Sequence, residues 1–144
     1  MIFQKRIIIS TDGENIFHNI TKHVKEIVKE SNIVNGLVHV YSKHTTMAIK
    51  ITEDCRLMQY DCKNKLRELA PREGRYSHDL IDMRDVPPDE RINGFSHIRQ
   101  LLMNTSETLP LMSSKIVLGE WQNLFAVELD PNRAREIIVT VVGE

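Results

Sequence analysis

Three of the six histidines stand in polar settings that a packed core does not require. His44 begins the run His44-Thr45-Thr46, His78 follows Tyr76-Ser77, and His97 comes four residues after Asn93. Imidazoles that converge in a fold can hold a metal, hold an anion or transfer protons. The sequence therefore predicts a histidine site, provided that the fold brings these distant residues together.

Each histidine has both a functional and a structural interpretation. The hydroxyls and amides of Thr45 and Thr46 can accept an oxyanion, but threonines beside His44 also fit simple β propensity. His78 lies either in a functional loop or in a solvated one. His97 lies near the start of a short helix, where free amides attract anions, or it is a partly buried helical residue. No spacing such as His-Glu-x-x-His fixes a metal geometry, although three imidazoles with a water suit an open zinc site.

Other polar residues are weaker candidates. Glu53, at the end of the strand after His44, can serve as acid, base or partner to a ligating group. Arg133 and Arg135, near Asp130, can bind a phosphate, contact another subunit or form a surface ion pair. For the remaining histidines and the tryptophan we predict structural positions: His18 and His23 facing solvent, His39 within a strand, Trp121 in the core.

The elements that must position these residues follow from hydrophobic periodicity and turn residues. A helix from Thr21, as N-cap, to Ser31 buries Val24, Ile27 and Val28. A second helix, about 55–69, has Asp54 as N-cap, places Leu57, Leu66 and Leu69 inward, and ends at Pro71. A long loop over 71–94 is expected to be functional, and a short helix covers 95–104. We predict strands at 3–9, 15–19, 37–42, 47–52, 109–112, 115–119, 121–129 and 136–142.

The strands cluster at the end of the chain rather than alternating with helices, which favours an α+β fold with a largely antiparallel sheet. A length of 144 residues fits one domain, 1–144. Cys55 and Cys62 lie about 10.5 Å apart along one helix, too far for a disulfide, so we expect free thiols.

Charge and hydropathy exclude some classes of protein. A net charge of −1 argues against a general nucleic-acid binder. No segment has the apolar length of a membrane span. The N-terminus lacks the apolar region of a secretion signal, so a cytoplasmic location is expected.

Taken in order, a set of short motifs resembles the YjbQ-like family. The resemblance runs from about Gly36 to Glu144, with a weaker similarity before it. The matching pieces are Gly36, His44-Thr45-Thr46, Glu53, Leu69-Ala70-Pro71, Tyr76-Ser77-His78-Asp79, Asn93 with His97, Gly119-Glu120-Trp121-Gln122, Glu128, Arg133 and Gly143-Glu144. The chain departs from the family pattern at Glu120 and at Asp130-Pro131-Asn132-Arg133, which affects substrate contacts rather than the fold.

The resemblance implies a two-sheet β-sandwich with two main helices, in the order two strands, helix, two strands, helix, three strands. It also implies a homotrimer and a pocket where His44, His78 and His97 hold a divalent metal such as zinc or magnesium. The implied activity is a weak or secondary thiamine-phosphate synthase reaction, which joins hydroxymethylpyrimidine diphosphate to thiazole phosphate.

Such a reaction releases diphosphate, so the site must stabilise negative charge. We expect His44, His97 and Glu53 to act in catalysis, and Thr45, Thr46, Asn93 and Arg133 to bind substrate phosphate. The chain has no Gly-rich phosphate loop and no Asp-rich magnesium motif. The alternatives are therefore a metal-dependent enzyme acting on another phosphorylated small molecule, or a non-catalytic trimeric module that binds a metal or an anion.

Overall fold

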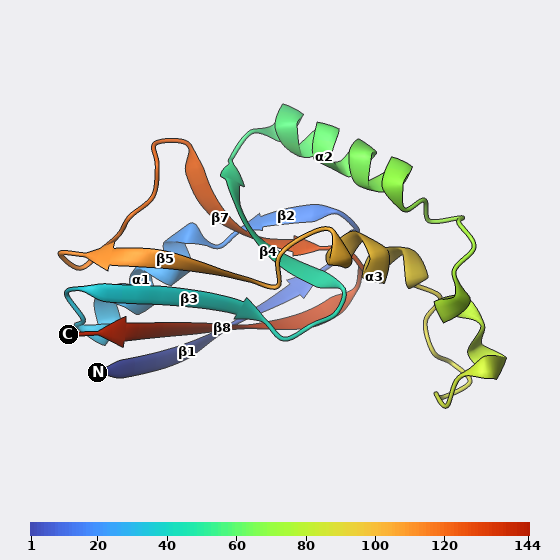
Figure 1. The fold of residues 1–144 in the computed structure, drawn as a ribbon, viewed down its shortest axis with the longest axis horizontal. Coiled ribbons are helices and arrows are strands. Elements are labelled where there is room, and N and C mark those ends of the chain that lie inside the picture. The colour runs from blue at the N-terminus through green and yellow to red at the C-terminus, as the bar shows by residue number, and fades with distance from the viewer.

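Two antiparallel β-sheets face each other in the computed structural model, which describes residues 1–144 (Figure 1). The five-stranded sheet has the order β1 (Ile2–Thr11), β8 (Arg133–Gly143), β3 (Gly36–Ser42), β5 (Ser106–Met112) and β6 (Lys115–Ile116). The three-stranded sheet has the order β2 (Ile16–Asn19), β7 (Gln122–Glu128) and β4 (Met47–Glu53). The predicted α+β class, antiparallel pairing and sandwich are confirmed.

The main core lies between the two sheets and the helix α1 (Thr21–Ser31). In β3 the side chains of Val38 and Val40 are buried, whereas those of Leu37, His39 and Tyr41 are exposed. This alternation is the one predicted from the sequence, because successive strand residues point to opposite faces. Val24, Ile27 and Val28 of α1 close the core as expected. Burial of each such side chain contributes roughly 1.5–3 kcal/mol.

Strand β8 is an internal strand of the larger sheet, paired with β1 on one side and β3 on the other. Its last residue, Gly143, pairs with Gly36 at the start of β3. A Cβ on Gly36 would lie 2.0 Å from the Val142 carbonyl oxygen, and one on Gly143 would lie 2.0 Å from the Asn35 carbonyl oxygen. Only glycines allow the two backbones to approach this closely.

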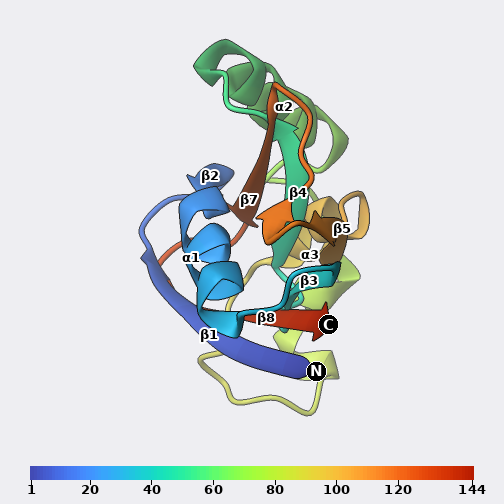
Figure 2. The same cartoon turned by 90° about the vertical axis from the view of Figure 1, so that its left-hand side faces the viewer.

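Two helices lie outside the sandwich. Helix α2 (Arg56–Leu69) runs along one end of the molecule, and α3 (Gly94–Leu101) lies near the turn between β3 and β4 (Figures 1 and 2). Leu66 packs on the outer face of the three-stranded sheet, beside Phe125 and Val127. The predicted inward positions of Leu57 and Leu69 were wrong, because both side chains are mostly exposed.

Both predicted helix N-caps were also wrong. Thr21 is the first helical residue and Ile20 is the N-cap. The Thr21 hydroxyl instead accepts the backbone N–H of Leu124 at 2.9 Å, which fastens α1 to β7. At α2 the N-cap is Cys55, and the carboxylate of Asp54 accepts hydrogen bonds from the side chains of Asn19 and Gln59. Contacts with other elements therefore replaced local capping.

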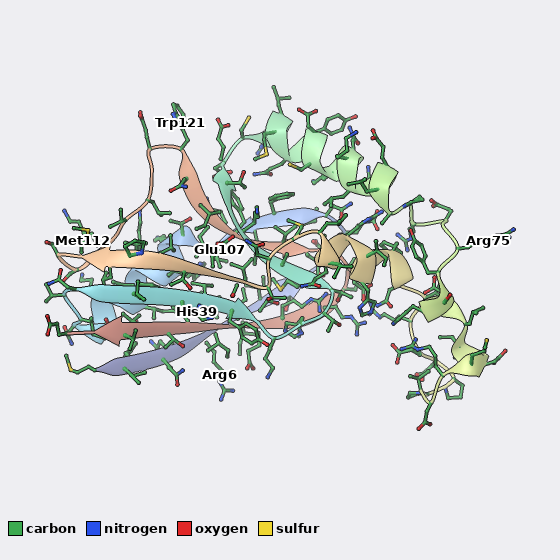
Figure 3. The ribbon with its side chains drawn as sticks, viewed as in Figure 1. Arg6, His39, Arg75, Glu107, Met112 and Trp121 are labelled. Carbon is green, nitrogen blue, oxygen red and sulfur yellow. The ribbon has the colours of Figure 1, made fainter.

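The second half of the chain differs from the prediction in detail. Four strands, β5 to β8, follow α3, which agrees with the four predicted segments, whereas the order implied by the resemblance has three. The loop over 71–94 is confirmed and contains two short 3-10 turns, η1 (Ser77–Asp79) and η2 (Ile81–Met83). Trp121 is 68% exposed rather than in the core, because the segment between β6 and β7 projects from the sandwich (Figure 3).

Three smaller predictions concern cysteines, histidines and hydropathy. Cys55 and Cys62 are free thiols, as expected. His23 is exposed, but the Nε2 atom of His18 is buried without a hydrogen-bond partner, so its predicted solvent position was wrong. His39 is bound to Thr108 on the neighbouring strand, at 2.8 Å. No helix is long and apolar enough to cross a membrane.

Candidate functional site

A cavity of about 330 Å³ lies where the β3–β4 turn, the 71–94 loop, the start of α3 and the start of β8 meet. Every residue that lines it is polar or charged. The three predicted histidines, His44, His78 and His97, all line this one cavity. The other lining residues are Lys43, Thr45, Thr46, Arg84, Glu90, Asn93, Arg133 and Arg135.

His44 is held by the first residues of β8. Its Nε2 atom accepts the backbone N–H of Glu136 at 2.9 Å. Because this bond uses the lone pair of Nε2, the proton of the neutral ring lies on Nδ1, and the ring is a hydrogen-bond donor there. Burial and, after it, the charge of Arg135 lower the pKa of His44, which keeps the ring neutral.

This geometry bears on the metal expected at the three histidines. With one nitrogen accepting an N–H and the other carrying the proton, His44 has no lone pair for a metal while its bond to Glu136 holds. No group of three or more His, Cys, Asp or Glu side chains in the chain is arranged to hold one ion. The residues present therefore do not fit the three-histidine metal site that the sequence resemblance implied.

His78 and His97 form a second unit of the cavity lining. Their ring centroids are 4.3 Å apart, with the planes tilted by 41°. Burial, and after it the charge of His78, lowers the pKa of His97. The Nδ1 atom of His78 lies 3.5 Å from a carboxylate oxygen of Asp79. The pair therefore offers two imidazoles in different surroundings, an arrangement suited to acid–base chemistry.

Asp79 also fixes the start of α3. Its carboxylate accepts the backbone N–H of Gly94 at 2.8 Å, so one of the amides expected to attract an anion is already occupied. A Cβ on Gly94 would lie 2.5 Å from the Cβ of Tyr76. Glycine at this position allows the loop that carries His78 to approach the helix that carries His97.

Beneath the cavity, the buried guanidinium of Arg135 lies against the buried carboxylate of Glu128. Nε of Arg135 donates to Oε2 of Glu128 at 2.6 Å, and Nη2 donates to Oε1 of the same carboxylate. Nη2 also donates to the Thr46 hydroxyl at 2.9 Å. The third nitrogen, Nη1, donates to no protein atom, although Arg135 lines the cavity.

Asp130 organises a second polar cluster beside this pair. Its carboxylate accepts hydrogen bonds from Asn93 at 2.8 Å and from Arg133 at 2.9 Å, with Arg91 3.5 Å away. Burial alone would raise the pKa of Asp130, but the bonds from Asn93 and Arg133 and the charges of Arg133 and Arg91 lower it. Asp130 is therefore ionised and holds two of the lining residues in place.

Free N–H donors, rather than net charge, make this cavity suitable for an anion. Lys43, Arg133 and Arg135 each have a carboxylate partner, which offsets much of the positive charge. The backbone amides of Thr45 and Thr46, however, donate to no protein acceptor. Together with Nη1 of Arg135 and Nδ1 of His44, they supply donors that an oxyanion can accept from at once.

Most of the predicted site residues lie together, with one exception. Thr45, Thr46, Asn93 and Arg133 line the cavity with the three histidines. Glu53 does not: it is the exposed last residue of β4, whereas the cavity lies at the first residue of that strand. The strand rises about 3.3 Å per residue, so Glu53 lies roughly 20 Å away within one chain.

Sequence reasoning left three cavity residues unassigned, Lys43, Arg84 and Glu90, and gave Arg135 only as a weaker phosphate-binding candidate. Arg135 alternates with the buried Ile137, Val139 and Val141 along β8, so a charge at a core position of period two was a usable signal. Lys43, Arg84 and Glu90 lie in turns and loops, where no periodicity distinguishes one charged residue from another.

Comparisons with known proteins agree with this fold. A UPF0047 protein of Methanothermobacter thermautotrophicus is 35% identical over 126 residues, covering 88% of this chain and 82% of its own. The UPF0047 protein YjbQ of Escherichia coli O157:H7 is 29% identical, with both chains covered completely. A YbjQ-like protein of unknown function from Sulfolobus solfataricus has a TM-score of 0.89 and 29% identity, with 100% of this chain and 99% of that one covered.

A second solved structure, a hypothetical protein from Aeropyrum pernix, has a TM-score of 0.86 and 26% identity, covering 98% of each chain. The pattern of the family described as UPF0047 protein YjbQ-like matches residues 5–144. This match extends the similarity to the first strand and helix, which the motifs alone reached only weakly. The chain belongs to the UPF0047, YjbQ-like family.

Proposed function

We propose that the chain is an enzyme that acts on a phosphorylated small molecule in the histidine-lined cavity. The observation that carries this proposal is the set of unused donors, Nη1 of Arg135 and the amides of Thr45 and Thr46. The residues that carry them line a cavity of a size suited to a small ligand. Donors fixed in advance by the surrounding structure stabilise negative charge without reorganisation.

The two histidine units give this proposal its acid–base chemistry. His44 donates through Nδ1 and so stabilises a phosphate oxygen on which charge develops. His97 is kept neutral by burial and by His78, and a neutral imidazole can accept a proton. His78, beside Asp79, is placed to return one. Positioned groups of this kind contribute roughly 10²–10⁴-fold to a rate.

Thiamine-phosphate synthesis is the specific reaction that we propose as a secondary activity. The C–O bond of hydroxymethylpyrimidine diphosphate breaks, diphosphate leaves with the electron pair, and the thiazole nitrogen forms the new C–N bond. The donors at Thr45, Thr46 and Arg135 support departure of diphosphate. The cavity of one chain, however, has no apolar residue on which the pyrimidine ring would pack, which favours a weak side reaction.

Binding of inorganic phosphate, followed by calorimetry, tests the anion site directly. We expect binding in the millimolar range or tighter, because several donors converge. Arg84→Gln, at the cavity, should weaken it about fivefold, since a charge-assisted contact is lost. Arg75→Gln is the matched control, because Arg75 lies on the same loop but points away from the body of the molecule (Figure 3). Absence of phosphate binding would overturn the proposal.

Turnover decides between an enzyme and a non-catalytic anion-binding module. A panel of phosphate esters, together with the two thiamine precursors, should include a substrate whose turnover falls at least 10²-fold in His97→Ala. His44→Ala should reduce it by a similar factor, because an oxyanion donor is lost. Phosphate binding without any turnover would favour the binding module instead, whereas turnover unchanged in both variants would exclude His44 and His97 as the catalytic groups.

We also propose that the chain assembles as a homotrimer. Leu57 and Tyr60 on α2, and Trp121 in the projecting loop at the same end of the molecule, are all more than half exposed (Figures 1 and 3). Large apolar side chains gathered on one surface are typical of subunit contacts. A trimer would bury this surface while leaving the sandwich unchanged.

A further inference from the structure

Asn93 is a buried amide at the cavity wall whose two polar atoms have different surroundings. Its side chain is 3% exposed. Nδ2 donates to a carboxylate oxygen of Asp130 at 2.8 Å, whereas Oδ1 has no hydrogen-bond partner. The reverse orientation of the amide would set its oxygen against a carboxylate, which is repulsive. The unused atom is therefore the oxygen, an acceptor.

A buried acceptor without a donor is unusual, since the large majority of buried polar side-chain atoms are hydrogen-bonded. Nδ1 of His78 also has no hydrogen-bond partner, and the unused groups at Thr45, Thr46 and Arg135 are N–H donors that suit an oxyanion. The dianion of a phosphate monoester cannot by itself satisfy Asn93, because none of its phosphate oxygens carries a hydrogen. A ligand that satisfies both the N–H donors and the Asn93 oxygen carries an anionic group and a hydrogen-bond donor.

We infer, on the basis of the proposed function, that the ligand is a small aliphatic phosphate ester bearing a hydroxyl that donates to Oδ1 of Asn93. No apolar residue lines the cavity, so an aromatic ring or a plain alkyl chain gains little from entering it. A hydroxylated chain keeps its polar groups bonded to the cavity walls. The phosphate binds the donors of the β3–β4 turn and Arg135. Asn93 recognises the hydroxyl on the carbon chain.

Calorimetry on the full chain with three probes tests this inference: inorganic phosphate, glycerol 3-phosphate, and n-propyl phosphate, which has the same carbon chain without hydroxyls. We expect glycerol 3-phosphate to bind roughly tenfold more tightly than n-propyl phosphate, because the analogue leaves a buried acceptor unpaired. Equal affinities would overturn the inference and leave the proposed function standing. Failure of all three probes to bind would overturn the proposed function itself.

Two variants show whether Asn93 is the residue that discriminates. Asn93→Leu removes the acceptor at similar volume, and the tenfold preference should fall to within about twofold. Ser96→Ala is the matched control, because the Ser96 hydroxyl bonds the Leu129 carbonyl at 2.6 Å and also ties α3 to the segment before β8. The Ser96→Ala variant should keep the tenfold preference for glycerol 3-phosphate over n-propyl phosphate. A preference retained in folded Asn93→Leu would overturn the inference, and the wild-type probe series remains decisive if that variant does not fold.

Discussion

Arg135 and Glu128 form a bidentate ion pair that is almost completely buried beneath the cavity, with Nε 2.6 Å from Oε2. The carboxylate also accepts the Thr11 hydroxyl at 2.6 Å and the Asp130 amide at 2.8 Å. Through Thr46, the guanidinium reaches the β3–β4 turn. One pair thus joins both sheets to the turn that carries His44.

We expect Glu128→Gln to lower the free energy of unfolding by about 3–5 kcal/mol, because it leaves the buried guanidinium of Arg135 without its counter-charge. Urea denaturation followed by circular dichroism measures the change. Glu136→Gln is the comparison, since its pair with Lys43 is partly exposed and should contribute at most about 1 kcal/mol. Similar losses in the two variants would show that the buried pair has no special role.

His18 gives the stability a defined dependence on pH. Burial lowers the pKa of His18 below 6.5, although the charges of Glu128 and Asp12 oppose the shift. The unfolded chain therefore binds a proton that the folded chain does not, and the stability contribution is full above pH 6.5 and is lost as the pH falls toward the folded-state pKa.

Replacing His18 should flatten this profile. His18→Gln is expected to reduce the loss of stability between neutral pH and pH 5, measured by denaturation at a series of pH values. His44 and His97, whose pKa values are also lowered, keep part of the slope in the variant. His23→Gln, which alters an exposed residue of α1, should show the same dependence of stability on pH as the wild type. An identical slope in His18→Gln would contradict the assignment.

Zinc binding should not depend on His44. Its Nε2 lone pair is engaged by the Glu136 amide, so a metal would have to break that bond first. Titration with Zn²⁺ should give dissociation constants within about threefold for wild type and His44→Gln, a change of less than about 1 kcal/mol. A tenfold loss of zinc affinity would instead support the three-histidine site that the sequence led us to expect.

The oligomeric state is a further expectation open to direct measurement. Sedimentation equilibrium should give three times the 16.7 kDa mass of the chain. Tyr60→Glu places a charge on the apolar surface of α2 and should shift the protein toward monomers. Lys65→Glu is the control, because it changes a position on the same helix that is already charged. A wild-type monomer at micromolar concentration would refute the trimer.

How much the sequence predicts differs between elements. The strands of the core and α1 followed from alternation and helical periodicity, because their side chains bury one face against a single partner surface. Helix α2 was predicted with nearly its observed bounds, but its inward face was not, since Leu57 and Leu69 are mostly exposed and only Leu66 is buried. Thr21 and Asp54 look like caps locally, but Thr21 binds Leu124 of β7 and Asp54 binds Asn19 of β2. Periodicity describes the faces of a single element and does not show which other elements pack against it.

The sequence by itself determined the α+β class, the antiparallel pairing, the family and the identity of the polar residues at 44–46, 78, 93 and 97. Only the tertiary structure decided that they share one cavity, that Glu53 lies outside it, and that Arg135 lies beneath it. It also decided the proton position on His44, because a backbone amide of β8 occupies the ring's lone pair. Residue type sets which bonds a side chain can make, whereas the packing of distant strands sets which of those bonds are made.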